Sequence, residues 1–300
     1  MKIIFFGTPD FAIPSLKILN ESKHEVLAVV TAPDKQRGRG RKVSFTPVKK
    51  YALENNLQIL QPEKLNNDDF VQELKKFNAD LFVIVAFRIL PTSVFTIPPE
   101  GSFNLHGSLL PKYRGAAPIQ WALINGEKET GVTTFFLKEK VDTGNIIAQE
   151  KIEITEEDNL GTLHDKMSEI GAMLVLKTVE IIEEGNIKLK EQDNSLATPA
   201  PKITKAICKI DWNKPAIEIH NLIRGISPFP GAYFISNNKQ FKIFKSKIVE
   251  EKKLKPSQIE QTKKEIFIGT ADGTIQVLEI QPEGRKRMTA EEFLRGYSLV

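Results

Sequence analysis

Cysteine is almost absent from this chain of 300 residues, because Cys208 is the only one. A single thiol excludes a disulfide framework and any metal site built from several cysteines. The four histidines add no metal motif, since no two of them lie four residues apart. We therefore expect no metal cofactor and a reducing compartment.

Long hydrophobic runs are also lacking. No run approaches the roughly 20 apolar residues that are needed to span a bilayer. The apolar stretch at residues 3–6 meets Gly7-Thr8-Pro9-Asp10 too early to be a secretory signal. The sequence therefore predicts a soluble protein of the cytoplasm.

Glycine-rich cofactor loops are missing as well. Gly7 follows the first strand-like run, but the Gly-x-Gly-x-x-Gly pattern of dinucleotide-binding folds is absent, and Pro9 removes a backbone donor from the turn. Residues 38–42, Gly-Arg-Gly-Arg-Lys, lack the spacing of a phosphate-binding loop. We expect neither a nicotinamide nor a flavin cofactor.

The composition that remains is that of a globular protein, with 41% hydrophobic and 27% charged residues. Its positive charge is unevenly distributed. Residues 201–300 carry 18 basic and 11 acidic side chains, whereas residues 1–200 carry 24 and 27. Residues 34–50 are a local exception, with seven basic side chains and one acidic. Both basic regions would attract a polyanion such as nucleic acid.

Strand-like and helix-like segments alternate in the first half of the chain. Apolar, β-branched runs predict strands at residues 2–6, 26–31, 58–60, 80–87 and 102–105. Helical spacing occurs at residues 11–19, 47–55, 68–77 and 119–124. This order favours a Rossmann-like α/β domain, with a mostly parallel sheet and helices on both faces. Its ligands are expected at the carboxyl ends of the strands.

The second half changes character. Residues 131–137 and 145–154 predict a hairpin or two edge strands, and a long helix follows at 160–184, before Gly185. After a polar linker at 190–205, a helix is expected at 216–224 and strands at 241–249, 265–269 and 274–280. We therefore predict a catalytic α/β domain at 1–189 and a small, basic, OB-like β-barrel at 206–300.

Asn104 and His106 end a predicted strand just before Gly107. Residues two apart on a strand point to the same face. Histidine exchanges protons near neutral pH, and an amide can donate a hydrogen bond to a developing oxyanion. The pair therefore suits acyl transfer to an amine that attacks directly, although an isolated Asn-x-His pair is more often structural.

Asp142 lies in the turn Val141-Asp142-Thr143-Gly144, between the two β-branched runs. A carboxylate in such a tight turn can reach a neighbouring loop and orient an imidazole. A capped turn is the commoner role of an isolated Asp-Thr-Gly. Asn104, His106 and Asp142 together are our candidate catalytic residues.

Two stretches carry a resemblance to a known family. Residues 103–111 read Phe-Asn-Leu-His-Gly-Ser-Leu-Leu-Pro and residues 114–119 read Arg-Gly-Ala-Ala-Pro-Ile. They resemble the signature of formyltransferases that use 10-formyltetrahydrofolate, and in particular of the branch that formylates methionyl-tRNA. The resemblance spans nearly the full chain and is strongest up to about residue 190.

The resemblance implies a function and assigns residues to it. The expected reaction moves the formyl group of 10-formyltetrahydrofolate, as co-substrate, to the α-amine of methionyl-initiator-tRNA, and the enzyme is expected to be a monomer. Asn104, His106 and Asp142 match the family's catalytic trio. The matching folate-binding residues are Ser108, Leu109, Leu110, Pro111, Arg88, Ile89 and Leu90. The matching basic loop, expected to be mobile and to bind tRNA, contains Lys35, Arg37, Arg39, Arg41 and Lys42.

One segment departs from the family pattern, and other functions remain open. Residues 86–91 are one residue shorter than usual and have Arg88 in place of a glycine. Formyltransferases of nucleotide sugars and of glycinamide ribonucleotide share the Asn-x-His signature. The former tend to read Arg-Gly-Arg-Ala-Pro at 114–118, and the latter lack a basic second domain. A non-catalytic RNA-binding protein is a remote alternative.

Overall fold

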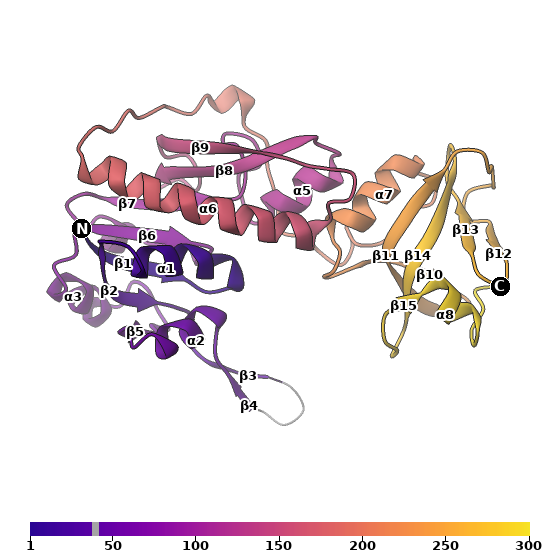
Figure 1. Cartoon of the computed structure of the whole chain (residues 1–300), viewed down its shortest axis with the longest axis horizontal. Coiled ribbons are helices and arrows are strands. Elements are labelled where there is room, and N and C mark those ends of the chain that lie inside the picture. The colour runs from indigo at the N-terminus through magenta and orange to yellow at the C-terminus, as the bar shows by residue number, and fades with distance from the viewer. Residues whose placement is uncertain (38–41) are drawn as a thin grey trace. The chain divides into compact units, whose positions relative to one another are not determined.

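The computed structural model describes residues 1–37 and 42–300, and it divides into two compact units (Figure 1). The first unit comprises Met1–Gly115, Gly131–Ile152 and His164–Pro199. The second comprises Ala116–Thr130, Glu153–Leu163 and Ala200–Val300. Within the described residues, no helix is long and apolar enough to cross a membrane. The boundaries at 189 and 205 stay a prediction, as does the cytoplasmic location.

The first unit is built on a seven-stranded sheet with the order β5-β2-β1-β6-β7-β8-β9. The first five strands of this order pair in parallel, and β8 joins β7 antiparallel. The predicted mostly parallel sheet is therefore confirmed. The strands are β1 (Lys2–Gly7), β2 (Glu25–Val30), β5 (Ile59–Leu60), β6 (Leu81–Val85), β7 (Ser102–His106), β8 (Glu129–Phe136) and β9 (Ile146–Glu153).

Helices cover both faces of this sheet. Phe6 of β1 packs with Leu74 and Val94, which belong to α3 and α4 on one face. On the other face, Leu105 of β7 lies so close to Gly171 of α6 that an added Cβ would meet it at 2.7 Å. The helices of the first unit are η1 (Asp10–Ala12), α1 (Ile13–Asn20), α2 (Pro47–Glu54), α3 (Asp68–Lys76), α4 (Thr92–Phe95) and, from His164 onward, α6 (Leu160–Glu183), whereas α5 (Pro118–Ile124) belongs to the second unit.

The helix ends follow local sequence signals. The Thr46 hydroxyl caps α2 by accepting a hydrogen bond from the Lys49 backbone N–H, and Pro47 takes the first helical position, where it needs no donor. Asn67 caps α3 in the same way. Helix α6 ends just before Gly185, which has a φ of 71° and so takes the left-handed conformation expected of a C-terminal glycine.

The basic segment at residues 35–45 corrects a prediction. We expected a loop without secondary structure, but Lys35–Arg37 (β3) and Lys42–Ser44 (β4) form an antiparallel ribbon, with Lys35 opposite Ser44. Two short antiparallel strands can satisfy each other's backbone groups. This pairing needs no alternation of apolar residues, so the sequence pattern did not reveal it.

The second unit contains an antiparallel half-barrel with the order β10-β11-β14-β13-β12, and β15 pairs with β14. Its core includes Phe234, Ile243, Ile275 and Phe293, and α5 packs against α7. The predicted strands at 265–269 and 274–280 are confirmed, and they pair as the antiparallel neighbours β13 and β14. Its elements are α7 (Ala216–Gly225), β10 (Ala232–Ser236), β11 (Lys239–Val249), β12 (Ile259–Gln261), β13 (Ile266–Gly269), β14 (Thr274–Pro282), β15 (Met288–Thr289) and α8 (Ala290–Leu294).

Candidate active site

Two polar side chains of β7 lie on one face of the first sheet. Asn104 stands opposite Ile84 of the parallel strand β6, and His106 stands opposite Thr133 of the antiparallel strand β8. Because side chains alternate along a strand, both point to the same face, as predicted. Asn104 is half-buried, and its amide has no hydrogen-bond partner within the described part of the chain. The amide is therefore available to a ligand.

The His106 imidazole is buried between two oxygen atoms. Its Nε2 lies 2.8 Å from the backbone carbonyl oxygen of Tyr113, which can only accept, so Nε2 carries a proton. Its Nδ1 lies 3.9 Å from Oδ2 of Asp142. This distance is too long for a hydrogen bond, so the Asp142 carboxylate lies beside the imidazole without bonding to it.

The turn that carries Asp142 is constrained on several sides. Asp142 has a φ of 55°, in the left-handed region that aspartate tolerates better than most residues. Its carboxylate accepts a hydrogen bond of 2.9 Å from the Gly115 backbone N–H. An added Cβ on Gly144 would fall 1.6 Å from the carbonyl oxygen of Phe136, so only glycine fits. The turn thus brings together Asp142 and His106, which lie 36 residues apart in the sequence.

The segment at 108–111, predicted to contact folate, is fastened by buried polar groups. The fully buried Ser108 hydroxyl donates to the backbone carbonyl four residues later, at 2.6 Å. Thr133 donates to the Ser108 carbonyl at 2.6 Å and accepts from the Leu110 N–H at 3.2 Å. Gln149 donates to the Leu110 carbonyl at 3.0 Å. The protein itself therefore holds the backbone of this segment in place, and its contact with folate stays a prediction.

Residues 88–90, the second segment predicted to contact folate, are hydrogen-bonded to the chain that follows β5. The Arg88 guanidinium donates to the backbone carbonyls of Pro62 and Glu63, at 2.8 and 3.0 Å. Ile89 is 73% exposed, whereas Leu90 is buried. Arg88 therefore already has protein partners, and a folate contact by these residues remains a prediction.

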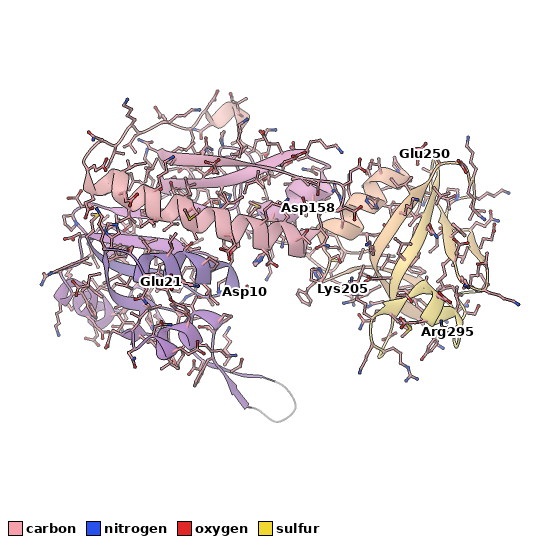
Figure 2. The ribbon with its side chains drawn as sticks, in the orientation of Figure 1. Asp10, Glu21, Asp158, Lys205, Glu250 and Arg295 are labelled. Atoms are coloured by element: carbon pink, nitrogen blue, oxygen red, sulfur yellow. The ribbon has the colours of Figure 1, made fainter. Side chains whose placement is uncertain are left out.

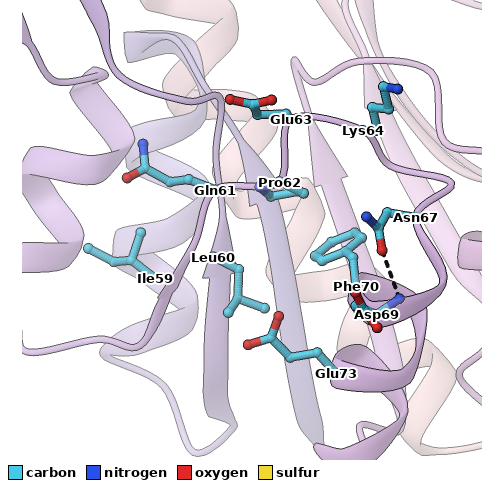
Figure 3. Close-up of a pocket in the computed structure, with 10 residues that line it drawn as sticks. All are labelled: Ile59, Leu60, Gln61, Pro62, Glu63, Lys64, Asn67, Asp69, Phe70 and Glu73. Atoms are coloured by element: carbon cyan, nitrogen blue, oxygen red, sulfur yellow. Dashed lines mark hydrogen bonds between the residues drawn. The ribbon is translucent and has the colours of Figure 1, made fainter.

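A cavity of about 700 Å³ opens beside this junction (Figure 3). Its wall includes Pro62 and Glu63, whose carbonyls accept from Arg88. None of the lining residues is among the predicted site residues. They are Ile59, Leu60, Gln61, Pro62, Glu63, Lys64, Asn67, Asp69, Phe70 and Glu73.

Some of the predicted tRNA-binding residues lie on the β3–β4 ribbon. Lys35 and Arg37 lie on β3 and Lys42 begins β4, whereas Arg39 and Arg41 lie outside the described residues. The structure therefore places three of the five on one ribbon. Their contact with tRNA stays a prediction.

A polar network near this ribbon joins Asp34, Lys49 and Gln61. The Lys49 ammonium group donates to Asp34 at 2.5 Å and to Gln61 at 2.7 Å, and it lies over the Phe45 ring. Gln61 donates in turn to the other carboxylate oxygen of Asp34 at 2.9 Å. The hydrogen bonds from Gln61 and from Lys49 hold the pKa of Asp34 below its usual value.

The second unit presents basic side chains on its own surface. Lys245 and Lys247 are exposed and lie two residues apart on β11, so they share a face. Figure 2 shows further charged side chains of this unit, among them Lys205 and Arg295. The excess of positive charge at residues 201–300 therefore includes cations that are open to solvent.

Several polar residues around Asp142 were missed in the sequence. Gln192 is buried and donates to the carbonyls of Asp142 and Gly144, although it lies in the predicted linker. Arg114 donates to Gln192, and Thr133 and Gln149 hold the 108–111 segment. Arg114 and Thr133 had a signal, because both belong to stretches that resemble the family. Gln149 and Gln192 lie outside those stretches.

Comparison with known proteins gives two matches to family models. Residues 1–179 match the model described as "Formyl transferase" and residues 202–298 match "Formyl transferase, C-terminal domain". Among solved structures, the sugar 3N-formyltransferase WlaRD covers 95% of this chain and 99% of its own, with a TM-score of 0.70 and 26% identity. An N-formyltransferase from Helicobacter canadensis has a TM-score of 0.68, covers 96% of this chain and all of its own, and at 24% identity supports the fold alone.

Curated relatives are more similar in sequence. The methionyl-tRNA formyltransferase of Caldanaerobacter subterraneus subsp. tengcongensis is 47% identical over all of this chain and 98% of its own length. The enzyme of that name from Bacteroides fragilis is 45% identical over all of this chain and 96% of its own length. At such identity over the full length, the chain belongs to the formyl transferase family, in its methionyl-tRNA formyltransferase branch.

Proposed function

We propose that this chain transfers the formyl group of 10-formyltetrahydrofolate to the α-amino group of methionyl-initiator-tRNA. The observation that carries the proposal is the convergence of three polar groups at the end of β7. The His106 Nδ1 lies 3.9 Å from the Asp142 carboxylate, and the half-buried Asn104 amide lies on the same face of the strand. The similarity to methionyl-tRNA formyltransferases over the full chain supports the choice of acceptor.

The reaction needs one bond to form and one to break. The amine nitrogen of the acceptor bonds to the formyl carbon, the bond from that carbon to N10 of the folate breaks, and one proton passes from the amine to N10. No oxidant, reductant or metal enters this balance. The work left to the protein is to stabilise negative charge on the formyl oxygen and to move that proton.

The three side chains can divide this work. The Asn104 amide donates to the formyl oxygen as negative charge develops there. His106 already holds one proton on Nε2 through its bond to the Tyr113 carbonyl, so Nδ1 is the atom that takes up the amine proton and passes it on. Asp142 stabilises the cationic imidazole in the meantime. Direct attack by the amine explains why no nucleophilic side chain is required.

The backbone of 108–111 is proposed as a rigid wall for the folate. Thr133 and Gln149 fasten it from β8 and β9, so its position does not depend on a bound ligand. Residues 88–90 are proposed to contribute a second wall. The fixed geometry would hold the formyl carbon near the end of β7 and exclude water from it.

The tRNA is proposed to be held by attraction between its phosphates and basic side chains. The cations of the β3–β4 ribbon and of the second unit would contact phosphates, which position a nucleic acid without reading its sequence. Lys245 and Lys247 are exposed and therefore accessible to phosphates.

A transfer assay with alternative acceptors tests the proposed function. The purified protein and 10-formyltetrahydrofolate are incubated with methionyl-initiator-tRNA, and parallel reactions contain an amino-sugar nucleotide, glycinamide ribonucleotide or uncharged initiator tRNA. We expect formyl transfer only to methionyl-tRNA. Transfer to a small acceptor alone would instead assign one of the related formyltransferase activities. Binding of tRNA without any transfer would leave a non-catalytic RNA-binding protein.

A further inference from the structure

Gln192 is a buried glutamine whose amide is fully used. It lies on the polar segment at residues 190–199 and is 6% exposed. Its Nε2 donates to the backbone carbonyls of Asp142 at 3.0 Å and Gly144 at 2.8 Å. Its Oε1 accepts from Nε and Nη2 of Arg114, at 3.0 and 2.6 Å. The side chain therefore bridges the Asp142 turn and the Arg-Gly-Ala-Ala-Pro stretch.

The chemistry of this bridge permits a single orientation. A primary amide has two N–H donors and an oxygen with two lone pairs, and Gln192 uses all four. Rotating the amide by half a turn would place its N–H groups against the Arg114 guanidinium and its oxygen against two carbonyl oxygens. A buried polar group left unpaired in this way is costly. The two hydrogen bonds from the charged Arg114 guanidinium are stronger than hydrogen bonds between neutral groups, because one partner is ionised.

The bridge encloses the hydrogen bond that orients the catalytic carboxylate. Asp142 accepts from the N–H of Gly115, the residue directly after Arg114. Gln192 therefore holds the acceptor through the Asp142 carbonyl and the donor through the Arg114 side chain. Without Gln192, the carbonyls of Asp142 and Gly144 would lose their side-chain donor, and the turn would keep the Gly115 hydrogen bond and the packing of Gly144 against Phe136.

The same segment supports the other partner of His106. The Thr198 hydroxyl accepts from the Tyr113 N–H and its carbonyl accepts from the Arg114 N–H, both at 2.9 Å. The Tyr113 carbonyl is the group that lies 2.8 Å from the imidazole Nε2. Residues 190–199 thus fasten the groups on both sides of His106.

We propose that Gln192, acting with Arg114, is a positioning residue for formyl transfer. It fixes the Asp142 carboxylate relative to Nδ1 of His106 and does not touch the reacting atoms. This proposal rests on the proposed function, because it requires Asp142 to act in the transfer. It also gives a catalytic task to a segment that the sequence predicts to be a linker.

The first test replaces the amide by an apolar side chain of similar length. In Gln192→Met the Asp142 turn loses two hydrogen bonds, and we expect kcat to fall about 10²-fold, because a displacement of about 1 Å at a reacting group costs that much. The KM values for folate and for methionyl-tRNA should not change, since the residue contacts neither substrate. The matched control is Asn194→Ala, which removes an exposed acceptor of Arg114 but leaves the bonds to Asp142 and Gly144 intact. An unchanged kcat in a folded Gln192→Met would overturn the proposal.

A double-mutant cycle distinguishes this proposal from the proposed function. If Gln192 acts through Asp142, the combination of Gln192→Met with Asp142→Asn should be no slower than Asp142→Asn alone. Losses that multiply would show that Gln192 acts by another route and would overturn the inference. A wild-type rate in Asp142→Asn alone would instead overturn the proposed role of Asp142.

A second substitution keeps the test valid if Gln192→Met does not fold, which its thermal unfolding midpoint will show. Gln192→Glu retains an acceptor for Arg114 but turns a carboxylate oxygen towards the carbonyls of Asp142 and Gly144. We expect a fall in kcat similar to that of Gln192→Met, although the ion pair with Arg114 should help the variant to fold. A folded Gln192→Glu with wild-type kcat would overturn the proposal.

Discussion

The sheets of the two units differ in where they place their polar side chains. In the first unit, β6 is buried along its whole length, and β7 ends in the buried His106. In the second unit, β11 buries Phe241 and Ile243 but exposes Lys245 and Lys247 to solvent. The strands of a parallel sheet that helices cover on both faces have continuous apolar sequences. In an antiparallel sheet with one face in solvent, apolar and polar residues alternate along each strand.

This difference separates two kinds of function. A polar group inside the first unit is costly unless it is hydrogen-bonded, so His106, Asp142 and Gln192 form fixed networks. Such preorganised groups are suited to stabilising a transition state. Lys245 and Lys247 of the second unit are instead exposed to solvent, which suits the attraction of phosphates. The units should therefore respond differently to substitution, salt and acid.

The largest effect is expected at Asn104. In Asn104→Ala the formyl oxygen loses a donor, and kcat should fall about 10²- to 10³-fold, because one such hydrogen bond is worth that much in rate. His106→Ala should show a loss of similar size. The affinity for tRNA should stay unchanged, as measured by filter binding beside single-turnover formyl transfer. Wild-type turnover in either variant would contradict the assignment.

A somewhat smaller loss is expected for Asp142→Asn. Asparagine also tolerates the positive φ, and its carbonyl can still accept from the Gly115 N–H, so the turn should keep its shape. The charge that stabilises the imidazolium is lost, and kcat should fall about 10²-fold, within the range of general acid–base catalysis. Thermal unfolding should give a midpoint close to that of the wild type. If the folded variant retained its rate, the carboxylate would have no part in the transfer.

Removal of basic side chains should weaken tRNA binding and leave kcat unchanged, whereas the substitutions at Asn104 and His106 should lower kcat and leave tRNA affinity unchanged. Lys245→Ala combined with Lys247→Ala should weaken tRNA binding and reduce the slope of log Kd against log salt by about 0.8 for each phosphate that the protein no longer neutralises. The kcat at saturating tRNA should not change. Arg37→Ala with Lys42→Ala tests the β3–β4 ribbon in the same way. Lys75→Ala with Lys76→Ala, on the exposed side of α3, is the matched control. An equal weakening in all three pairs would indicate a response to net charge alone.

The smallest effect concerns acid stability. Hydrogen bonds from Lys23 and from the Met1 ammonium group lower the pKa of Glu183 to about 2. Because this pKa is depressed in the folded state, the stabilisation is present above about pH 4.5 and is lost as the pH falls through about 2. Glu183→Gln should therefore flatten the loss of stability in this window, as followed by urea unfolding.

Glu292 of the second unit provides the comparison. The Thr289 backbone N–H and hydroxyl also hold its pKa below the usual value, but no cation bonds to it directly within the part of the chain that the structure describes. Glu292→Gln should flatten the acid dependence less than Glu183→Gln does. The reverse order would show that the ion pairs of Glu183 contribute less than the helix cap.

Much of the first unit could be predicted because its strands are short apolar runs and its helices begin at recognisable caps. Thr46 and Asn67 are such caps, and Gly185 ends the longest helix. Helix α8 went unnoticed, although Thr289 and Glu292 form a capping box that could have revealed it. The β3–β4 ribbon gave no signal, since its backbone pairing is independent of side-chain type.

The sequence alone determined the main alternation of strands and helices in the first half of the chain, the mostly parallel sheet, the concentration of cations at residues 34–50 and 201–300, and the placement of Asn104 and His106 on one face. These features depend on local periodicity, composition and the alternation of side chains along a strand. Only the tertiary structure showed that Asp142 lies 3.9 Å from His106 and that Gln192 holds the Asp142 turn. These contacts join residues separated by 36 and 50 positions. Local sequence patterns cover only a few residues, so they do not show which distant residues come into contact when the chain folds.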